Sequence, residues 1–98
     1  MVAYLIVDAE QFDDERALEY RALAEASIYQ YGGRYLVMGA EPEALAGTWP
    51  ASRRMTVLEF PDKARLEQWH ASPEYTAAAE IRKTAIDVRM VIADGIPG

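Results

Sequence analysis

The order of apolar and polar positions along the chain predicts alternating strands and helices. Residues 2–10, VAYLIVDAE, are rich in Val, Ile and Tyr and precede the polar stretch QFDDE, which is typical of a strand of about seven residues. Three similar segments follow, at residues 34–38, 53–60 and 88–93. In the first two of these four segments neither face is polar throughout, so we expect a sheet that is covered on both sides.

Two helical regions separate these strands. The first lies between QFDDE and the glycine pair at residues 32–33, which is expected to end it. The second contains Trp69 and is then interrupted, because Ser72 suits an N-cap and Pro73 suits the first helical position. We therefore expect one continuous helix and, between residues 62 and 85, a helix broken in two.

A long connection separates the second strand from the third. Residues 39–52, GAEPEALAGTWPAS, combine glycine and proline with acidic residues, as irregular segments do. Connections of this length are often functional or reach a partner. Three interpretations stay open: a solvated loop, a protruding hairpin, or an arm over a partner subunit.

The order β-α-β-β-α-β predicts an α+β chain with the ferredoxin-like arrangement. Right-handed crossovers place both helical regions on one side of a four-stranded antiparallel sheet. The other side would then expose apolar strand residues to water. We therefore expect two sheets to pack face to face, which gives a homodimer with a barrel-like core, a dimeric α/β barrel.

Length and composition narrow the class of protein. The 98 residues suit one domain, expected to span residues 1–98, and 51% hydrophobic with 27% charged residues is typical of a folded globular chain. The net charge of −6 disfavours nucleic acid as a partner. The opening segment lacks a basic start, and its apolar run ends at Asp8, so neither a signal peptide nor a membrane span is expected. We expect a cytoplasmic protein.

His70, the only histidine, is the first candidate for acid/base chemistry, because an imidazole titrates near pH 6.5, about neutrality. The structural alternative is that His70 is only a polar residue near a helix end, where the carbonyl groups of the last turn stabilise an imidazolium. No metal or other cofactor is expected, since the chain has no cysteine, no second histidine and no HExxH spacing. A serine nucleophile is not expected either, because G-x-S-x-G is absent.

Carboxylates in the predicted strands are the second candidate. Glu59 lies within the apolar run VLEF, and Asp8 ends the apolar part of the first strand. If either points inward it needs a cationic partner, and four arginines are available: Arg34, Arg54, Arg82 and Arg89. Such a pair either fixes strand register or a dimer interface, or belongs to an active site.

Aromatic residues on the predicted helices are candidates for a ligand site. Tyr20, Trp69 and Tyr75 are expected to face the sheet, where they either fill the core or line a pocket for a flat ligand. Arg54 or Arg82 would hold the charge of such a ligand.

Three longer stretches carry a family resemblance: YGGRYLVMGAEPEALAGTW at residues 31–49, RRMTVLEFPD at 53–62 and WHASPEYTAAAEIR at 69–82. With AYLIVD and EYRAL nearer the start, they resemble the domain-of-unknown-function family thirteen-thirty, small bacterial proteins of the dimeric α/β-barrel superfamily. The resemblance implies a ferredoxin-like homodimer with a ligand pocket between the sheet and the helices of each protomer.

The same resemblance says little about the reaction. The superfamily includes cofactor-independent monooxygenases, small-ring isomerases, aldoxime enzymes and haem enzymes, whereas the family itself has no assigned activity. The family pattern accepts an aromatic residue such as Tyr where this chain has His70. It therefore implies no family-wide catalytic histidine.

Two functions follow as hypotheses. The first is a homodimer that binds a small organic acid or aromatic metabolite between its helices and its sheet. If it catalyses, we expect cofactor-independent acid/base chemistry, in which His70 or Glu59 moves the proton, an arginine holds the charge, and Tyr20 or Tyr75 orients the ligand. The alternative is a non-catalytic dimerisation or binding module whose polar residues are structural.

Overall fold

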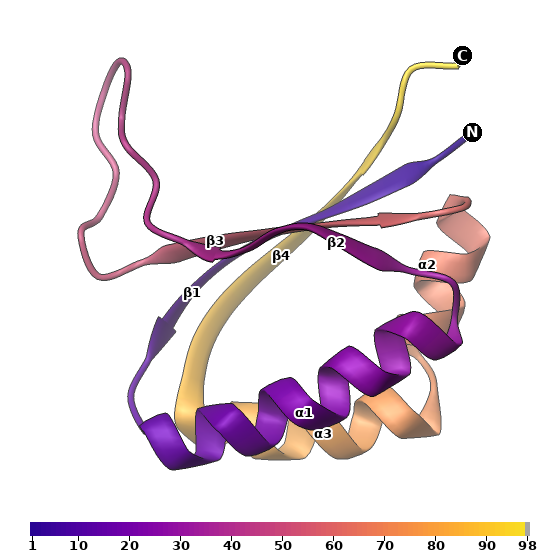
Figure 1. Ribbon diagram of the computed structural model, residues 1–98, viewed down its shortest axis with the longest axis horizontal. Helices are drawn as coiled ribbons and strands as arrows, with labels where there is room; N and C mark the ends of the chain where they lie inside the picture. Colours follow the sequence, from indigo (N-terminus) through magenta and orange to yellow (C-terminus); the bar gives the residue numbers. More distant parts are fainter. Residues whose placement is uncertain (98) are drawn as a thin grey trace.

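The computed structural model describes residues 1–97. Within them the elements follow one another as β1 (Ala3–Gln11), α1 (Asp14–Gln30), β2 (Arg34–Ala40), β3 (Arg54–Phe60), α2 (Lys63–His70), α3 (Pro73–Ala85) and β4 (Ile86–Asp94). The four strands form one antiparallel sheet in the order β2-β3-β1-β4. Helices α1 and α3 lie side by side across one face of it (Figure 1). The predicted ferredoxin-like fold is confirmed.

Local signals set the helix boundaries as the sequence predicts. The side chains of Asp13 and Asp62 accept hydrogen bonds from the backbone N–H groups three residues ahead, at 3.1 and 2.7 Å. Ser72 caps α3 in the same way at 3.1 Å, and Pro73 follows at the first helical position. Gly32 has a φ of 84°, which suits glycine where α1 ends. The predicted break in the second helical region is therefore present.

The core lies between the helices and the covered face of the sheet. Strand pairing places Leu5 opposite Leu58 and Ala3 opposite Phe60, and all four residues are buried beneath the helices. Trp69 and the other fully buried side chains of α2 and α3 pack on this layer. Burial of these large apolar groups is the main stabilising term for a chain of this size.

The opposite face of the sheet is open and carries an apolar row. Strand pairing aligns Val37, Val57, Ile6 and Val91 across β2, β3, β1 and β4 in turn. Three of the four, Val37, Ile6 and Val91, are at least 36% exposed. This face is uncovered within one chain, as the strand pattern predicts.

The connection between β2 and β3 protrudes from the sheet (Figure 1). It contains no helix or strand, and the side chain of Leu45 is fully exposed. Near the end of the connection, the Trp49 indole donates to the Arg53 carbonyl at 3.1 Å. Throughout residues 1–97, every helix is too short or too polar to cross a membrane.

Candidate functional site

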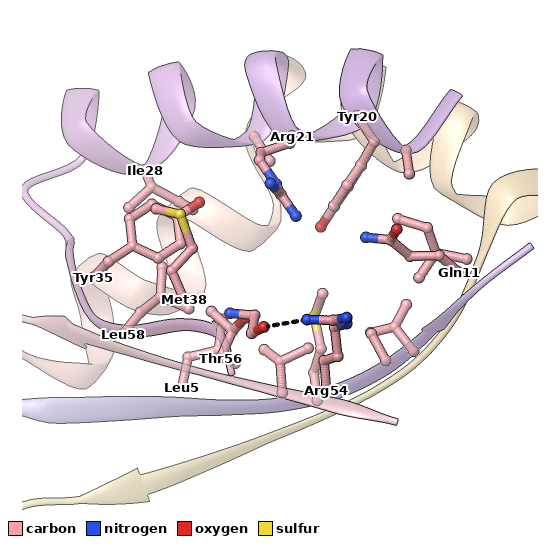
Figure 2. A pocket seen from close by; sticks show the side chains of 18 of the residues that line it. Leu5, Gln11, Tyr20, Arg21, Ile28, Tyr35, Met38, Arg54, Thr56 and Leu58 are labelled. Atoms are coloured by element: carbon pink, nitrogen blue, oxygen red, sulfur yellow. Dashed lines mark hydrogen bonds between the residues drawn. The ribbon is translucent and has the colours of Figure 1, made fainter. Parts of the chain in front are cut away.

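A cavity of about 100 Å³ lies between helix α1 and the covered face of the sheet (Figure 2). All four strands, α1 and Trp69 of α2 contribute to its wall. Most of this wall is apolar, as in many small-molecule sites. The apolar lining residues are Leu5, Val7, Ala9, Ala17, Ala24, Ile28, Met38, Leu58, Trp69, Ile86, Val88 and Met90.

Small residues on the inner face of α1 leave room for the cavity. Ala17 and Ala24 lie two helical turns apart, are 4% and 3% exposed, and face the sheet. Below them, alternate residues of β1, among them Leu5 and Val7, point up from the strand. Because an alanine methyl group reaches only a short way toward the sheet, the two layers do not close completely at this level.

Two arginines reach the cavity from its opposite layers. Arg21 points down from α1, and Arg54 points up from β3 (Figure 2). Both lie near Gly39. Arg54 Nη1 donates to the Gly39 carbonyl at 3.1 Å, and Arg21 Nη2 would be 3.9 Å from a Cβ atom added to Gly39. The residues that line the cavity include no Asp, Glu or His. In a chain of net charge −6, this wall is locally cationic.

The two arginines differ in their partners. Arg54 Nη2 also contacts the Glu41 carboxylate at 3.1 Å, just beyond the end of β2. Within residues 1–97, Arg21 makes no ion pair, and it is exposed to solvent. Within the described part of the chain, the site therefore has one cation in an ion pair, Arg54, and one outside any ion pair, Arg21.

Phenol groups supply further polar atoms. Tyr20 lines the cavity, and its hydroxyl is 3.0 Å from that of Tyr75. Burial raises the pKa of Tyr20 far above its usual value, and burial raises the pKa of Tyr35 to about 12. Both rings are neutral at physiological pH. They can donate or accept hydrogen bonds to a ligand but are not bases there.

The structure brings together some of the residues proposed from the sequence to bind a ligand. Tyr20, Arg54 and Trp69 line the cavity. Tyr75 lies directly behind Tyr20 and is 1% exposed. Arg82 does not line the cavity, although its charge acts on Tyr20, and its Nε atom is buried without a hydrogen-bond partner in the described chain.

The two residues proposed as catalytic lie elsewhere. His70 is exposed at the end of α2, its ring 5.6 Å from that of Tyr75, and it is not among the cavity residues. Glu59 pairs with Arg34 at 3.2 Å, in register with Tyr4 on the open face of the sheet. Neither side chain reaches the cavity. Their catalytic roles stay predictions, and their positions separate them from each other and from the site.

A network of charges occupies one end of the open face. Asp8 accepts two hydrogen bonds from Arg89 Nε and one from its Nη2, and it also pairs with Arg53. Arg53 is 8% exposed, and its Nη1 forms a second ion pair with the Asp87 carboxylate at 2.8 Å. Neither strand carboxylate points into the core: both lie on the open face, where Glu59 pairs with Arg34 and Asp8 with Arg89, two of the four arginines named from the sequence. Among residues 1–97 no group of three acidic or histidine side chains is arranged to hold a metal.

Sequence reasoning missed Arg21 and Arg53. The signal for Arg21 is its spacing, since it lies four residues after Ala17 and three before Ala24 and so shares the inner face of the helix. The signal for Arg53 is strand alternation, which places it on the same face as Met55 and Val57. In both cases a charged residue stands where the helix or strand period would place an apolar one.

The sequence matches a known family over nearly its whole length. The profile of the family described as "Domain of unknown function (DUF1330)" matches residues 2–96. No curated protein relative matches the chain.

Solved structures share the fold at low sequence identity. The RPA0582 protein of unknown function from Rhodopseudomonas palustris superposes with a TM-score of 0.77 at 16% identity, covering 99% of this chain and 84% of that one. A dimeric ferredoxin-like protein of unknown function from Jannaschia sp. CCS1 gives 0.70 at 16%, covering 97% and 100%. SnoaB, a cofactor-independent oxygenase from Streptomyces nogalater, gives 0.69 at 9%, covering 99% and 95%. Identities this low support a shared fold and no shared reaction.

Proposed function

The chain belongs to the DUF1330 family, whose function is unknown, so we propose a function from the cavity itself. The protein binds a small organic anion with an apolar or aromatic body. One observation carries this proposal. Arg21 and Arg54 reach an apolar cavity from opposite layers, and no acidic residue lines the same wall. A site of this kind matches an anionic head and an apolar body at once.

The size of the cavity limits the ligand. About 100 Å³ is available, and an engineered apolar cavity of about 150 Å³ holds one benzene molecule. Because the present cavity is smaller, the buried part of the ligand is at most a single ring or a short branched chain. Because Arg21 is exposed, the anionic end of the ligand would lie toward solvent, with the ring against Leu58 and Met90.

The charge of the site favours a carboxylate. A guanidinium presents its N–H groups in a planar fork that matches the two oxygens of a carboxylate. Arg21 is exposed and has no competing ion pair within residues 1–97, so its guanidinium is available to an incoming anion. Tyr20 and Thr56, which also line the cavity, are placed to orient the ligand by hydrogen bonding.

Binding, rather than proton transfer, is the activity that the lining supports. The cavity residues include no carboxylate or imidazole, and the raised pKa values of Tyr20 and Tyr35 keep these phenols protonated. No residue of the wall is therefore a base near neutral pH. The fold shared with SnoaB supplies a binding architecture for this proposal but no reaction.

We also propose that the protein is a homodimer that packs through the open face of the sheet. Support comes from the apolar row of Val37, Val57, Ile6 and Val91, and from neighbouring folds that are described as dimeric. Sedimentation of the wild type at micromolar concentration should give a dimer, and Val91→Lys should give a folded monomer. Leu45→Lys, which adds the same charge at a more exposed apolar position on the β2–β3 connection, is the control. A monomeric wild type would contradict the proposal.

Ligand binding is tested with benzoate and its neutral analogue benzamide. Calorimetry should show that benzoate binds the wild type more tightly than benzamide, and that Arg21→Gln and Arg54→Gln each weaken benzoate about tenfold or more. Arg16→Gln removes the same charge from an exposed position of α1 that does not line the cavity, so it should bind as the wild type does. Equal losses in all three variants, or no binding of either probe, would overturn the proposal.

A further inference from the structure

Glu41 holds one of the two cavity arginines in the unliganded protein. Its carboxylate lies 3.1 Å from Arg54 Nη2, while Arg54 Nη1 donates to the Gly39 carbonyl. Both terminal nitrogens of Arg54 therefore already have an acceptor. A carboxylate that approaches this end of the guanidinium with both oxygens has to share it with these acceptors.

The two acceptors on Arg54 differ in how readily they can leave. The Gly39 carbonyl belongs to the backbone of β2, whereas Glu41 is a side chain beyond the strand end, with 76% of it exposed. Arg54 is itself 51% exposed. Solvent-exposed ion pairs are weak, because water screens them and both side chains lose freedom when they pair. Glu41 is thus the acceptor that an anionic ligand can displace.

We propose that Glu41 is an internal competitor of the ligand and a specificity-determining residue of the cavity: it occupies Arg54 until the carboxylate of a bound organic acid displaces it. The proposal rests on the proposed function, since it concerns the same site. Arg21, without an ion pair in residues 1–97, binds the anion with no competitor to displace. Arg54 gives the ligand its full set of N–H donors only when the ligand carboxylate outcompetes Glu41.

The need to displace Glu41 makes the site select anionic ligands over neutral ones. A neutral molecule of the same shape cannot replace the Glu41 carboxylate on Arg54, because a neutral acceptor forms a weaker bond with a guanidinium than an anion does. A carboxylate replaces one ion pair by another, so Glu41 reduces its gain at Arg54 by the strength of one exposed ion pair without abolishing it. Removal of the Glu41 charge should therefore strengthen the binding of anions and leave neutral ligands unaffected.

The test compares Glu41→Gln with Glu43→Gln. Both changes remove one negative charge from an exposed position of the same connection, but only Glu41 pairs with Arg54. Calorimetric titration of the full-length protein should show benzoate binding about two- to fivefold tighter in Glu41→Gln than in the wild type. Benzoate binding to Glu43→Gln and benzamide binding to both variants should be unchanged.

A double variant separates contact from general electrostatics. In the Arg54→Gln background, Glu41→Gln should no longer strengthen benzoate binding, because the cation for which the two carboxylates compete is gone. An equal gain in Glu41→Gln and Glu43→Gln, or a gain that persists without Arg54, would overturn the competition. Normal benzoate binding that Glu41→Gln leaves unaltered would overturn this inference alone. Failure of benzoate to bind the wild type and Glu41→Gln would overturn the proposed function as well.

Discussion

The indole Nε1 of Trp69 donates a hydrogen bond to Ser27 Oγ at 2.9 Å, and both side chains are 1% exposed. The bond joins the last turn of α2 to the inner face of α1. Ser27 in turn donates to the Ala24 carbonyl at 2.7 Å, so its hydroxyl both accepts and donates. The stretch WHASPEY therefore acts first as a joint: Trp69 anchors one helix, and Ser72 starts the next.

Ser27→Ala should lower the free energy of unfolding by about 1–3 kcal/mol, because it leaves the buried Trp69 N–H without a partner. Urea unfolding at fixed protein concentration measures the loss. In a Trp69→Phe background no N–H remains to be satisfied, and the same serine substitution should cost clearly less. An equal cost in both backgrounds would show that the hydrogen bond does not stabilise the joint.

Gly33→Ala should destabilise the protein by about 1–3 kcal/mol through overpacking. A methyl group at this position would lie 2.7 Å from Phe60 Cζ and 2.8 Å from Ile28 Cγ2, which both belong to the packed core. Gly47→Ala is the matched control, since its methyl group meets no atom within 4 Å and only the positive φ of 76° is strained. Thermal unfolding should therefore show a lower Tm for Gly33→Ala than for Gly47→Ala. The reverse order would contradict the packing argument.

Asp8 should make stability depend on pH in the acid range. Hydrogen bonds from Arg89, together with those from Arg53, hold the pKa of Asp8 below its usual 3.8, against the opposing effect of burial. The folded state therefore binds this proton less readily than the unfolded state. The contribution of Asp8 is complete above its unfolded pKa and is lost as the pH falls through the lower folded value.

Asp8→Asn should accordingly cost about 1.5–3 kcal/mol near neutral pH, and the gap to the wild type should close as the pH falls below about 4. Urea unfolding across this range measures it. Asp94→Asn, at an exposed strand position without an ion pair in the described chain, should show neither the loss nor the pH trend. A gap that stays constant down to acid pH would exclude the depressed pKa as its cause.

His70→Ala and Glu59→Gln should leave the benzoate-induced rise in Tm as it is in the wild type. His70 is exposed outside the cavity, and Glu59 pairs with Arg34 on the other face of the sheet. Arg54→Gln, which alters the cavity wall, should reduce the rise in the same thermal-shift assay. Loss of the rise in His70→Ala would instead place this histidine in the ligand site.

Local chemistry accounts for what the sequence predicts correctly. The strands follow from runs of β-branched and aromatic residues, and the helices begin where Asp13, Asp62 and Ser72 can accept hydrogen bonds from the next turn. Because these signals act within a few residues, they need no knowledge of distant contacts. The order of elements then leaves few topologies, and the ferredoxin-like one is the result.

The site was predicted only in part, because it depends on how the layers meet. Tyr20, Trp69 and Arg54 could be expected from their positions in the pattern, and they do line the cavity. Arg21 breaks the apolar pattern of α1, and the space beneath it exists only because Ala17 and Ala24 face the sheet at that level. Contacts between layers depend on packing, which no local run of residues encodes.

The sequence alone therefore specifies the elements, their caps, the break at Ser72 and the apolar residues of the open face. Tertiary structure decides which arginine each carboxylate meets. Asp8 pairs with Arg53 as well as Arg89 because strand register brings the three residues together. His70 is exposed because Trp69 and Tyr75 take the buried positions around it. Side chains far apart in the chain become neighbours only through strand register and helix packing, and this long-range geometry places two cations on opposite sides of an apolar cavity.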